Sequence, residues 1–301
     1  MKTIQLHAIA ATAATLLLTT NAGHAVLAYA LSNGGTQLVK FDLATPAMTT
    51  LVGSIAGATT SLQGIDFRPA NGLLYGIDSA GRIVTVNTNT AGTTLASGPI
   101  VPNSGTGSLG IDFNPTVDRL RLVNVNDENL RINVDTGVVV LPVDGTLAYA
   151  AGDPNFGVNP SIIEAAYTNS DTNPATGTQL FYIDHSLDTL VSTLNPNVGS
   201  LTTVGALGVP TTDLVGFDIL SDGVGGNTAY ALLTLPGGSP GLYTINLATG
   251  GASLVGAIND QVVRPYSLAI TPPAPVPEPG TALFGLALIG TALTRRGRKS
   301  K

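Results

Sequence analysis

The sequence predicts an all-β protein, specifically a β-propeller with five four-stranded blades. Short runs rich in Thr, Val, Ile and Leu alternate with glycine-containing turns, a pattern that favours strands over helices. A strand followed by Asp or Asn and a turn recurs about every 45 to 60 residues, a period typical of propeller blades. Six or seven blades are the alternatives. The Asp and Asn markers are Asp42, Asn87, Asp135, Asn195 and Asn246.

The first unit contains fewer strands than the others. A hairpin joins residues 27–31 to 37–41 through an Asn-Gly-Gly turn at 33–35, and these turn residues accept the positive φ that a tight hairpin needs. A third strand covers 49–53, and the repeat region ends with a spare strand at 266–270. We expect this last strand to pair with the first unit and close the ring, because closure removes exposed strand edges.

The remaining four units are each predicted to contain four strands. The stretch 142–160 is looser and is predicted to be a long insertion between blades, of the kind that lies on one rim. The predicted strands are 62–69, 72–78, 81–87 and 93–95 in the second unit; 109–115, 119–123, 129–134 and 138–140 in the third; 163–167, 179–184, 189–194 and 201–204 in the fourth; and 214–219, 229–233, 241–245 and 252–255 in the fifth.

Composition excludes several classes of site. The chain has no cysteine, so it has no disulfide and no thiol nucleophile, and its histidines are His7, His24 and His185. A mature chain that keeps one histidine cannot form a multi-histidine metal centre. All 19 acidic residues lie between residues 26 and 279, which gives this region a net charge of about −12. Such a domain repels phosphate backbones, so we expect no nucleic-acid partner.

Both ends of the chain have the character of targeting segments. Residues 1–25 combine Lys2, an apolar run and a small-residue exit, which predicts a signal peptide cut by signal peptidase after Ala25. Ala22 and Ala30 are alternative cleavage positions. At the other end, 272–279 is a proline-rich stalk, 280–294 an uncharged apolar run predicted to form a short transmembrane helix, and 295–301 a basic tail expected to remain cytoplasmic. Fifteen helical residues span about 22 Å, so this anchor is marginal.

The C-terminal segment resembles the PEP-CTERM sorting signal of exosortase substrates. Pro277, Glu278 and Pro279 match its recognition motif and are followed by the short apolar run and a cluster of basic residues. The resemblance implies an exported protein of a Gram-negative bacterium, anchored transiently and then released to the cell surface or extracellular matrix. An ordinary C-terminal anchor with a proline-rich stalk is the alternative. The arginines of this basic tail are Arg295, Arg296 and Arg298.

The repeat region resembles a bacterial family of propeller-like domains of unknown function, the one numbered 4394. The resemblance rests on the Gly-Ile-Asp-Phe strands at 64–67 and 110–113 and on Leu-Tyr-x-Ile-Asn at 242–246, and it covers most of residues 27–270. It implies a propeller fold and no particular activity.

The aspartates of the Gly-x-Asp motif, Asp66, Asp112 and Asp218, are the candidate functional residues. Since they are equivalent in the repeat, their carboxylates could meet at the central channel and hold Ca²⁺ or Mg²⁺, or act as an acid–base pair. The alternative is structural: each carboxylate accepts backbone N–H bonds in its own turn. The fourth unit has Ala166 where an aspartate is expected, which argues against a symmetric ion site.

Two further groups of residues have side chains suited to catalysis or binding. His185, beside Asp184 and near Asp188, could serve as a base, although a lone histidine at a hairpin tip is usually solvated. Arg119, Arg121 and Arg131 alternate on neighbouring strands and could bind an acidic sugar, or could form salt bridges with Asp118 or Asp127.

These observations predict an exported propeller without catalytic activity, which binds extracellular polysaccharide or a surface protein or has a structural role. No cofactor is expected apart from a possible Ca²⁺ ion. The alternative is a propeller hydrolase or lactonase that uses the channel aspartates and a divalent metal.

Overall fold

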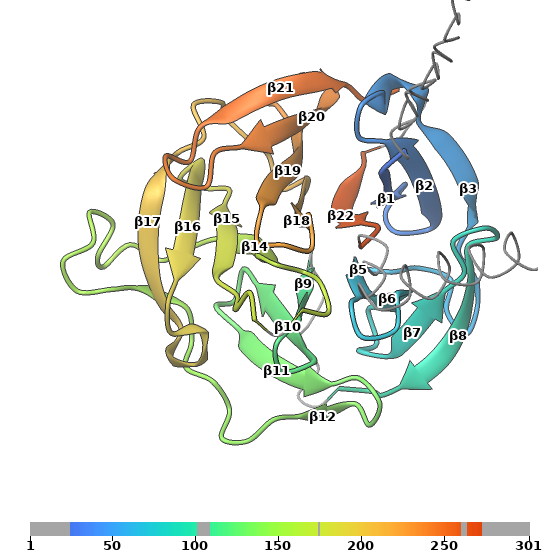
Figure 1. Cartoon of the computed structure of the whole chain (residues 1–301), viewed down its shortest axis with the longest axis horizontal. Coiled ribbons are helices and arrows are strands. Elements are labelled where there is room, and N and C mark those ends of the chain that lie inside the picture. Colours follow the sequence, from blue (N-terminus) through green and yellow to red (C-terminus); the bar gives the residue numbers. More distant parts are fainter. Residues whose placement is uncertain (1–24, 101–108, 174, 260–263, 273–301) are drawn as a thin grey trace, which may run out of the picture.

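The computed structural model describes residues 25–100, 109–173, 175–259 and 264–272, and these form five β-sheets arranged radially around a central axis (Figure 1). Each sheet is one blade, and the ring agrees with the predicted number of blades. The innermost strands are β22, β5, β9, β14 and β18. The predicted signal peptide (apart from Ala25), most of the stalk, the apolar run and the basic tail lie outside the described residues.

The blades are numbered in chain order. Blade 1 consists of β22 (Tyr266–Ile270), β1 (Leu27–Ser32), β2 (Gln37–Asp42) and β3 (Thr50–Ser54). Blade 2 consists of β5 (Gly64–Arg68), β6 (Leu73–Ile77), β7 (Ile83–Val86) and β8 (Gly92–Ser97), with β4 (Ala56–Gly57) at its outer edge. Blade 3 consists of β9 (Leu109–Asn114), β10 (Arg119–Asn124), β11 (Asn129–Asn133) and β12 (Val138–Val139).

Blades 4 and 5 complete the ring. Blade 4 consists of β14 (Ile162–Tyr167), β15 (Leu180–Asp184), β16 (Thr189–Thr193) and β17 (Ser200–Ala206), with β13 (Ala148–Tyr149) at its outer edge. Blade 5 consists of β18 (Val215–Ser221), β19 (Asn227–Thr234), β20 (Pro240–Ile245) and β21 (Ala252–Ala257). The short 3₁₀ turns η1 (Pro46–Met48) and η2 (Pro196–Val198) precede the outer strands of blades 1 and 4.

The ring closes as predicted, through the last strand of the chain. β22 pairs antiparallel with β1, with Ala28 opposite Ile270 and Ala30 opposite Leu268. The N–H of Thr271 also donates to the carbonyl of Leu27, at 2.9 Å. The beginning and the end of the propeller therefore lie side by side in blade 1 (Figure 1).

The predicted insertion at 142–160 contributes a strand of its own. Within it, β13 runs parallel to β17, with Ala148 opposite Ser200, and extends blade 4 outward. A similar short strand, β4, lies parallel to β8 in blade 2. Both strands belong to connections that run from the outer edge of one blade to the inner strand of the next.

The hydrophobic core is divided among the five interfaces between blades. Between blades 1 and 2, the rings of Tyr29 and Phe67 meet edge to face at 5.7 Å. Tyr75 and Phe113 repeat this contact between blades 2 and 3, at 5.4 Å. Because each interface is a separate apolar layer, every blade depends on both of its neighbours, which explains why the closing strand matters.

The turn markers agree with the sequence analysis in part. The side chains of Asp42, Asn87 and Asn246 accept backbone N–H bonds from residues two positions later. In blade 3, however, Asn133 makes this bond, and Asp135 is the donor of the N–H. The Asx turn in that blade therefore begins two residues before the predicted marker.

Glycine in the Gly-x-Asp motif allows the inner strands to approach closely. A Cβ atom on Gly110 would lie 2.5 Å from the Cα of Glu164 in blade 4, and one on Gly64 would lie 2.7 Å from the carbonyl oxygen of Leu109 in blade 3. Both contacts are with backbone, which cannot move aside without displacing a whole blade.

We expect Gly110→Ala to lower the free energy of unfolding by about 2 to 3 kcal/mol, because the added methyl group overpacks a backbone contact. Chemical denaturation measures this. Gly251→Ala is the matched control, since its Cβ would meet its nearest neighbour at an ordinary 3.6 Å. Equal stabilities of the two variants would contradict the role assigned to Gly110.

Among the residues that the structure describes, no helix has the length and apolar character needed to cross a membrane.

Candidate functional site

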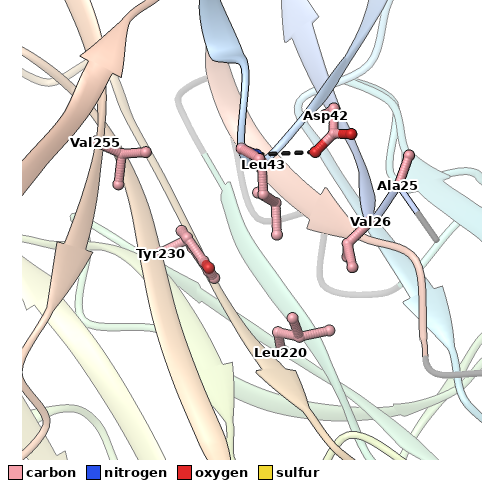
Figure 2. A pocket seen from close by; sticks show the side chains of 8 residues that line it. Ala25, Val26, Asp42, Leu43, Leu220, Tyr230 and Val255 are labelled. Atoms are coloured by element: carbon pink, nitrogen blue, oxygen red, sulfur yellow. Dashed lines mark hydrogen bonds between the residues drawn. The ribbon is translucent and has the colours of Figure 1, made fainter. Parts of the chain in front are cut away.

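A pocket of about 400 Å³ lies between blades 5 and 1 (Figure 2). Its walls are mostly apolar, and its one carboxylate, Asp42, accepts the N–H of Ala44 at 2.8 Å. The lining residues include no histidine or lysine that could act with Asp42 as a catalytic pair. They are Ala25, Val26, Asp42, Leu43, Ala44, Leu220, Tyr230 and Val255.

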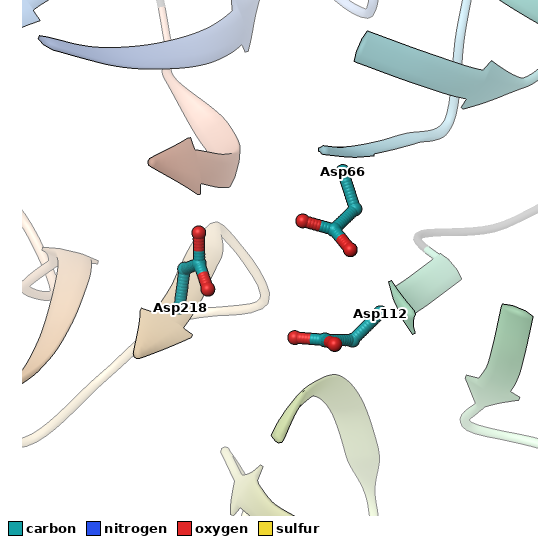
Figure 3. Close-up of side chains that lie close together, drawn as sticks. All are labelled: Asp66, Asp112 and Asp218. Carbon is teal, nitrogen blue, oxygen red and sulfur yellow. The ribbon is translucent and has the colours of Figure 1, made fainter. Parts of the chain in front are cut away.

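The three candidate aspartates meet at the central axis, as one of the two sequence interpretations predicts (Figure 3). Asp66 lies on β5, Asp112 on β9 and Asp218 on β18, each on the innermost strand of its blade. One oxygen from each carboxylate lies within 4.8 Å of the others. The three residues are 3%, 2% and 4% exposed, respectively.

Asp66 uses both of its oxygens to bind backbone N–H groups. Oδ1 accepts the N–H of Phe67 on its own strand at 2.7 Å, and Oδ2 accepts the N–H of Phe113 in blade 3 at 2.8 Å. The carboxylate therefore joins two neighbouring blades. These are backbone N–H bonds of the kind that the structural alternative describes, although one of the two runs between blades.

Asp218 follows the same scheme, whereas Asp112 follows only half of it. Asp218 accepts the N–H of Ile219 on its own strand and that of Ile270 in blade 1, both at 2.6 Å. Asp112 accepts the N–H of Tyr167 in blade 4 at 3.2 Å through Oδ2. Its Oδ1 is buried and has no hydrogen-bond partner among the described residues.

The unpartnered oxygen follows from a simple count. Three carboxylates offer six oxygens, and the ring supplies five N–H groups at the equivalent position, those of Phe67, Phe113, Tyr167, Ile219 and Ile270. Blades 4 and 1 have alanine in place of the aspartate. In the blades that follow them, blades 5 and 2, the N–H group is therefore bound by the aspartate of the same strand. One carboxylate oxygen, Oδ1 of Asp112, is therefore left without an N–H group to bind.

A fourth acid, Glu164, also faces the channel, and the sequence analysis missed it. It lies on β14 and is 2% exposed. The charges of Asp218 and Asp66 act on its carboxylate, which forms no hydrogen bond or ion pair with any described residue. Blade 4 lacks the motif aspartate, having Ala166 instead, but residues two apart on a strand share a face. That alternation could have identified Glu164.

Burial and mutual repulsion keep these acids protonated at higher pH than usual. Burial raises the pKa of Asp218 to about 7, against two backbone N–H bonds that lower it. Burial also raises the pKa of Asp66 and Asp112 well above the usual range, and neighbouring aspartates raise both further. Glu164 shifts in the same direction, first through burial and then through Asp218 and Asp66.

His185 is bonded to a serine and lacks an orienting acid. Its Nε2 lies 2.8 Å from Oγ of Ser161. Asp184 is the adjacent acid, but its carboxylate binds Tyr149, Ser186 and nearby backbone N–H groups. In the described part of the chain no carboxylate accepts a bond from the other ring nitrogen, so a catalytic triad is not assembled.

The arginines of blade 3 are structural. Arg121 is 1% exposed, and both it and Arg131 form salt bridges with Asp144. Arg119 donates to backbone carbonyls. Asp144 is therefore the carboxylate partner in place of the predicted Asp118 or Asp127, and the three arginines do not form an exposed site for an acidic sugar.

The family model described as "Domain of unknown function (DUF4394)" matches residues 37–267. The chain belongs to the DUF4394 family. The match runs from β2 to the beginning of β22, so it covers most of the propeller ring and leaves out β1. It therefore confirms the resemblance predicted from the Gly-Ile-Asp-Phe strands.

A second model, the PEP-CTERM protein-sorting motif, matches residues 275–299 of this DUF4394 chain. The signal implies export, surface or extracellular localisation, and processing by an exosortase-type enzyme. The motif and its basic residues lie outside the described part of the structure, as does the predicted helical anchor.

Comparison with solved structures finds matches of low similarity. PorZ, a surface component of the type-IX secretion system of Porphyromonas gingivalis, matches with 12% identity and a TM-score of 0.39 over 75% of this chain and 26% of that one. The dihydro-heme d1 dehydrogenase NirN, in complex with DHE, matches with 13% identity and a TM-score of 0.37 over 77% of this chain and 43% of that one.

Sqt1 of Saccharomyces cerevisiae matches with 15% identity and a TM-score of 0.37 over 78% of this chain and 60% of that one. The DUF4394 chain thus spans between 26% and 60% of the length of these three structures. Comparison with curated proteins finds no match.

Proposed function

We propose that this protein is a non-catalytic binding module that the cell exports, sorts through its C-terminal signal and displays outside, where it binds extracellular polysaccharide or a surface protein. The supporting observation is the state of the channel acids. Asp66, Asp112 and Asp218 are at most 4% exposed, and each binds backbone N–H groups. Acids held in this way stabilise the ring and are not accessible to a substrate.

The position of the chain ends suits a displayed module. Leu27 and Thr271 are hydrogen-bonded neighbours in blade 1, so the leader and the sorting tail both connect to one blade. Blades 2 to 5 carry neither connection. A propeller that is attached to the cell through one blade leaves its other blades available to contact a binding partner.

The hydrolase or lactonase alternative is not favoured. A hydrolytic site needs a reachable acid or nucleophile with a base in hydrogen-bond range. The channel acids are enclosed, and the Ser161–His185 pair lacks an orienting carboxylate. The pocket between blades 5 and 1 has apolar walls around one acid that is already bonded to backbone.

The test compares binding with turnover for the purified exported protein. We expect it to co-sediment with extracellular polysaccharide from the producing cells, and to release no product from that polysaccharide, from p-nitrophenyl acetate or from γ-butyrolactone. Product formation that Asp112→Asn or Ser161→Ala abolishes would contradict the proposal. Failure to retain polysaccharide would direct the search to surface proteins, by cross-linking on intact cells.

A further inference from the structure

Four acids on the innermost strands of four different blades surround the central axis, and three of them have carboxylate oxygens within 4.8 Å of one another. Asp66 comes from blade 2, Asp112 from blade 3, Glu164 from blade 4 and Asp218 from blade 5. We propose that these side chains bind one Ca²⁺ ion on the axis of the propeller. The inference goes beyond the proposed function, because the ion would serve the ring whatever the ring binds.

The separation of the oxygens fits a calcium ion. One oxygen from each of Asp66, Asp112 and Asp218 lies within 4.8 Å of the other two. Calcium binds oxygens at about 2.3 to 2.6 Å, so two ligands on opposite sides of one ion are at most about 5 Å apart. All three oxygens can therefore contact a single ion with little movement of the strands.

Two acceptors close to these oxygens are unused by the described residues. Oδ1 of Asp112 has no hydrogen-bond partner among the described residues. The Glu164 carboxylate is likewise unpartnered in the described chain, although its residue is 98% buried and the charges of two aspartates act on it. A buried carboxylate without a partner costs free energy of desolvation that a bound cation recovers.

The N–H bonds already formed do not compete with the ion. Each carboxylate oxygen has two lone pairs, so it can accept an N–H and bind a cation at once. The bonds from Phe113 to Asp66 and from Ile270 to Asp218 hold those carboxylates in place, as outer-shell partners do in metal sites.

Within the described ranges, no arginine or lysine forms a salt bridge with these four acids. The salt bridges among described residues join Arg68, Arg82, Arg121 and Arg131 to other aspartates. Up to four negative charges in a buried space therefore have no protein cation to balance them. A divalent ion can balance two of them, and protons can satisfy the remainder.

The chemical type of the ligand atoms indicates which ion would bind. All four side chains offer oxygen, and neither histidine nor cysteine takes part, which disfavours zinc and the softer transition metals. Magnesium requires ligands at about 2.0 to 2.1 Å in near-octahedral geometry and retains waters. The wider spread of these oxygens and the number of carboxylates favour calcium, which is available outside the cell.

The test uses the purified exported protein, first treated with a chelator and then titrated with CaCl₂ or MgCl₂. For a site in the affinity range of extracellular modules, with Kd of about 10⁻⁴ M, we expect calorimetry to find one Ca²⁺ per chain. At 10 mM Ca²⁺ the Tm should rise by about 5 to 10 °C.

Two variants locate the site. Glu164→Gln should keep the fold, since this side chain has no hydrogen bond to lose, and should weaken Ca²⁺ binding at least about tenfold. Asp112→Asn should do the same by placing an amide nitrogen where the unpartnered oxygen lies. Asp213→Asn, an exposed acid before β18, is the control and should bind Ca²⁺ as the wild type does.

Absence of both binding heat and a Tm shift in the wild type would overturn the proposal. So would wild-type affinity in Glu164→Gln, even if Asp112→Asn failed to fold, because the ion would then lie elsewhere. A response to Mg²⁺ without one to Ca²⁺ would overturn the assignment of the ion. None of these results depends on ligand binding by the outer surface, so this inference and the proposed function can fail separately.

Discussion

Replacing Asp144 with alanine is expected to lower the free energy of unfolding by about 3 to 5 kcal/mol, because it leaves a buried arginine without its counter-ion. Arg121 is 1% exposed, and Asp144 forms salt bridges with it and with Arg131. Asn197 of blade 4 also accepts a bond from Arg121, so the pair lies at the interface of blades 3 and 4. The loss should therefore loosen the ring.

Urea denaturation followed by circular dichroism measures this loss. Asp135→Ala is the matched control: Asp135 also pairs with an arginine, Arg68, but its side chain is 63% exposed and Arg68 keeps Asp118. Exposed ion pairs contribute less than about 1 kcal/mol. If the two variants lost the same stability, burial of Arg121 would not be the cause.

Without bound metal, the protein should lose stability as the pH rises from 5 to 8, with a contribution from Asp218 of about 3 kcal/mol within this window. The pKa of Asp218 is raised from 3.8 to about 7, so between these values the folded protein holds a proton that the unfolded chain has released. Its stabilising effect is complete below about pH 4 and disappears as the pH passes 7. Asp66, Asp112 and Glu164 shift in the same direction.

The measurement is the urea midpoint at several pH values in the presence of a chelator. Asp135, Asp153 and Asp222 have lowered pKa values and act in the opposite sense, but they do so below about pH 4, outside this window. Asp218→Asn removes one of the titrating groups and should make the pH profile less steep. A midpoint that stays constant or increases between pH 5 and 8 in the unmodified protein would contradict the prediction.

Much of the fold could be predicted because its signals are local. Each strand and turn is encoded within a few residues, so counting strands between glycine-rich turns predicted the ring and the pairing of 266–270 with the first hairpin. The sorting signal is contiguous and needs no fold to be recognised. Local signals also mislead: Asn133 and Asp135 are two residues apart, and either could begin an Asx turn, but the backbone places Asn133 there.

Part of the candidate site could also be predicted from the sequence. Equivalent positions in a repeat occupy equivalent places on successive blades, so Asp66, Asp112 and Asp218 were expected to meet near the axis, and one oxygen from each does lie within 4.8 Å of the others. Glu164 was missed because it occupies the glycine position of the motif, and only the shared face of a strand connects it to the channel.

Only the tertiary structure determined which hydrogen-bond and salt-bridge partners these side chains have. Asp66 binds the N–H of Phe113, 47 residues further along the chain, and Arg121 pairs with Asp144 although Asp118 and Asp127 are closer in sequence. Repetition dictates the blades, since each blade is a local structure with its own strands and turns. The contacts between blades depend on how the closed ring brings together atoms from distant repeats, and no local pattern encodes that geometry.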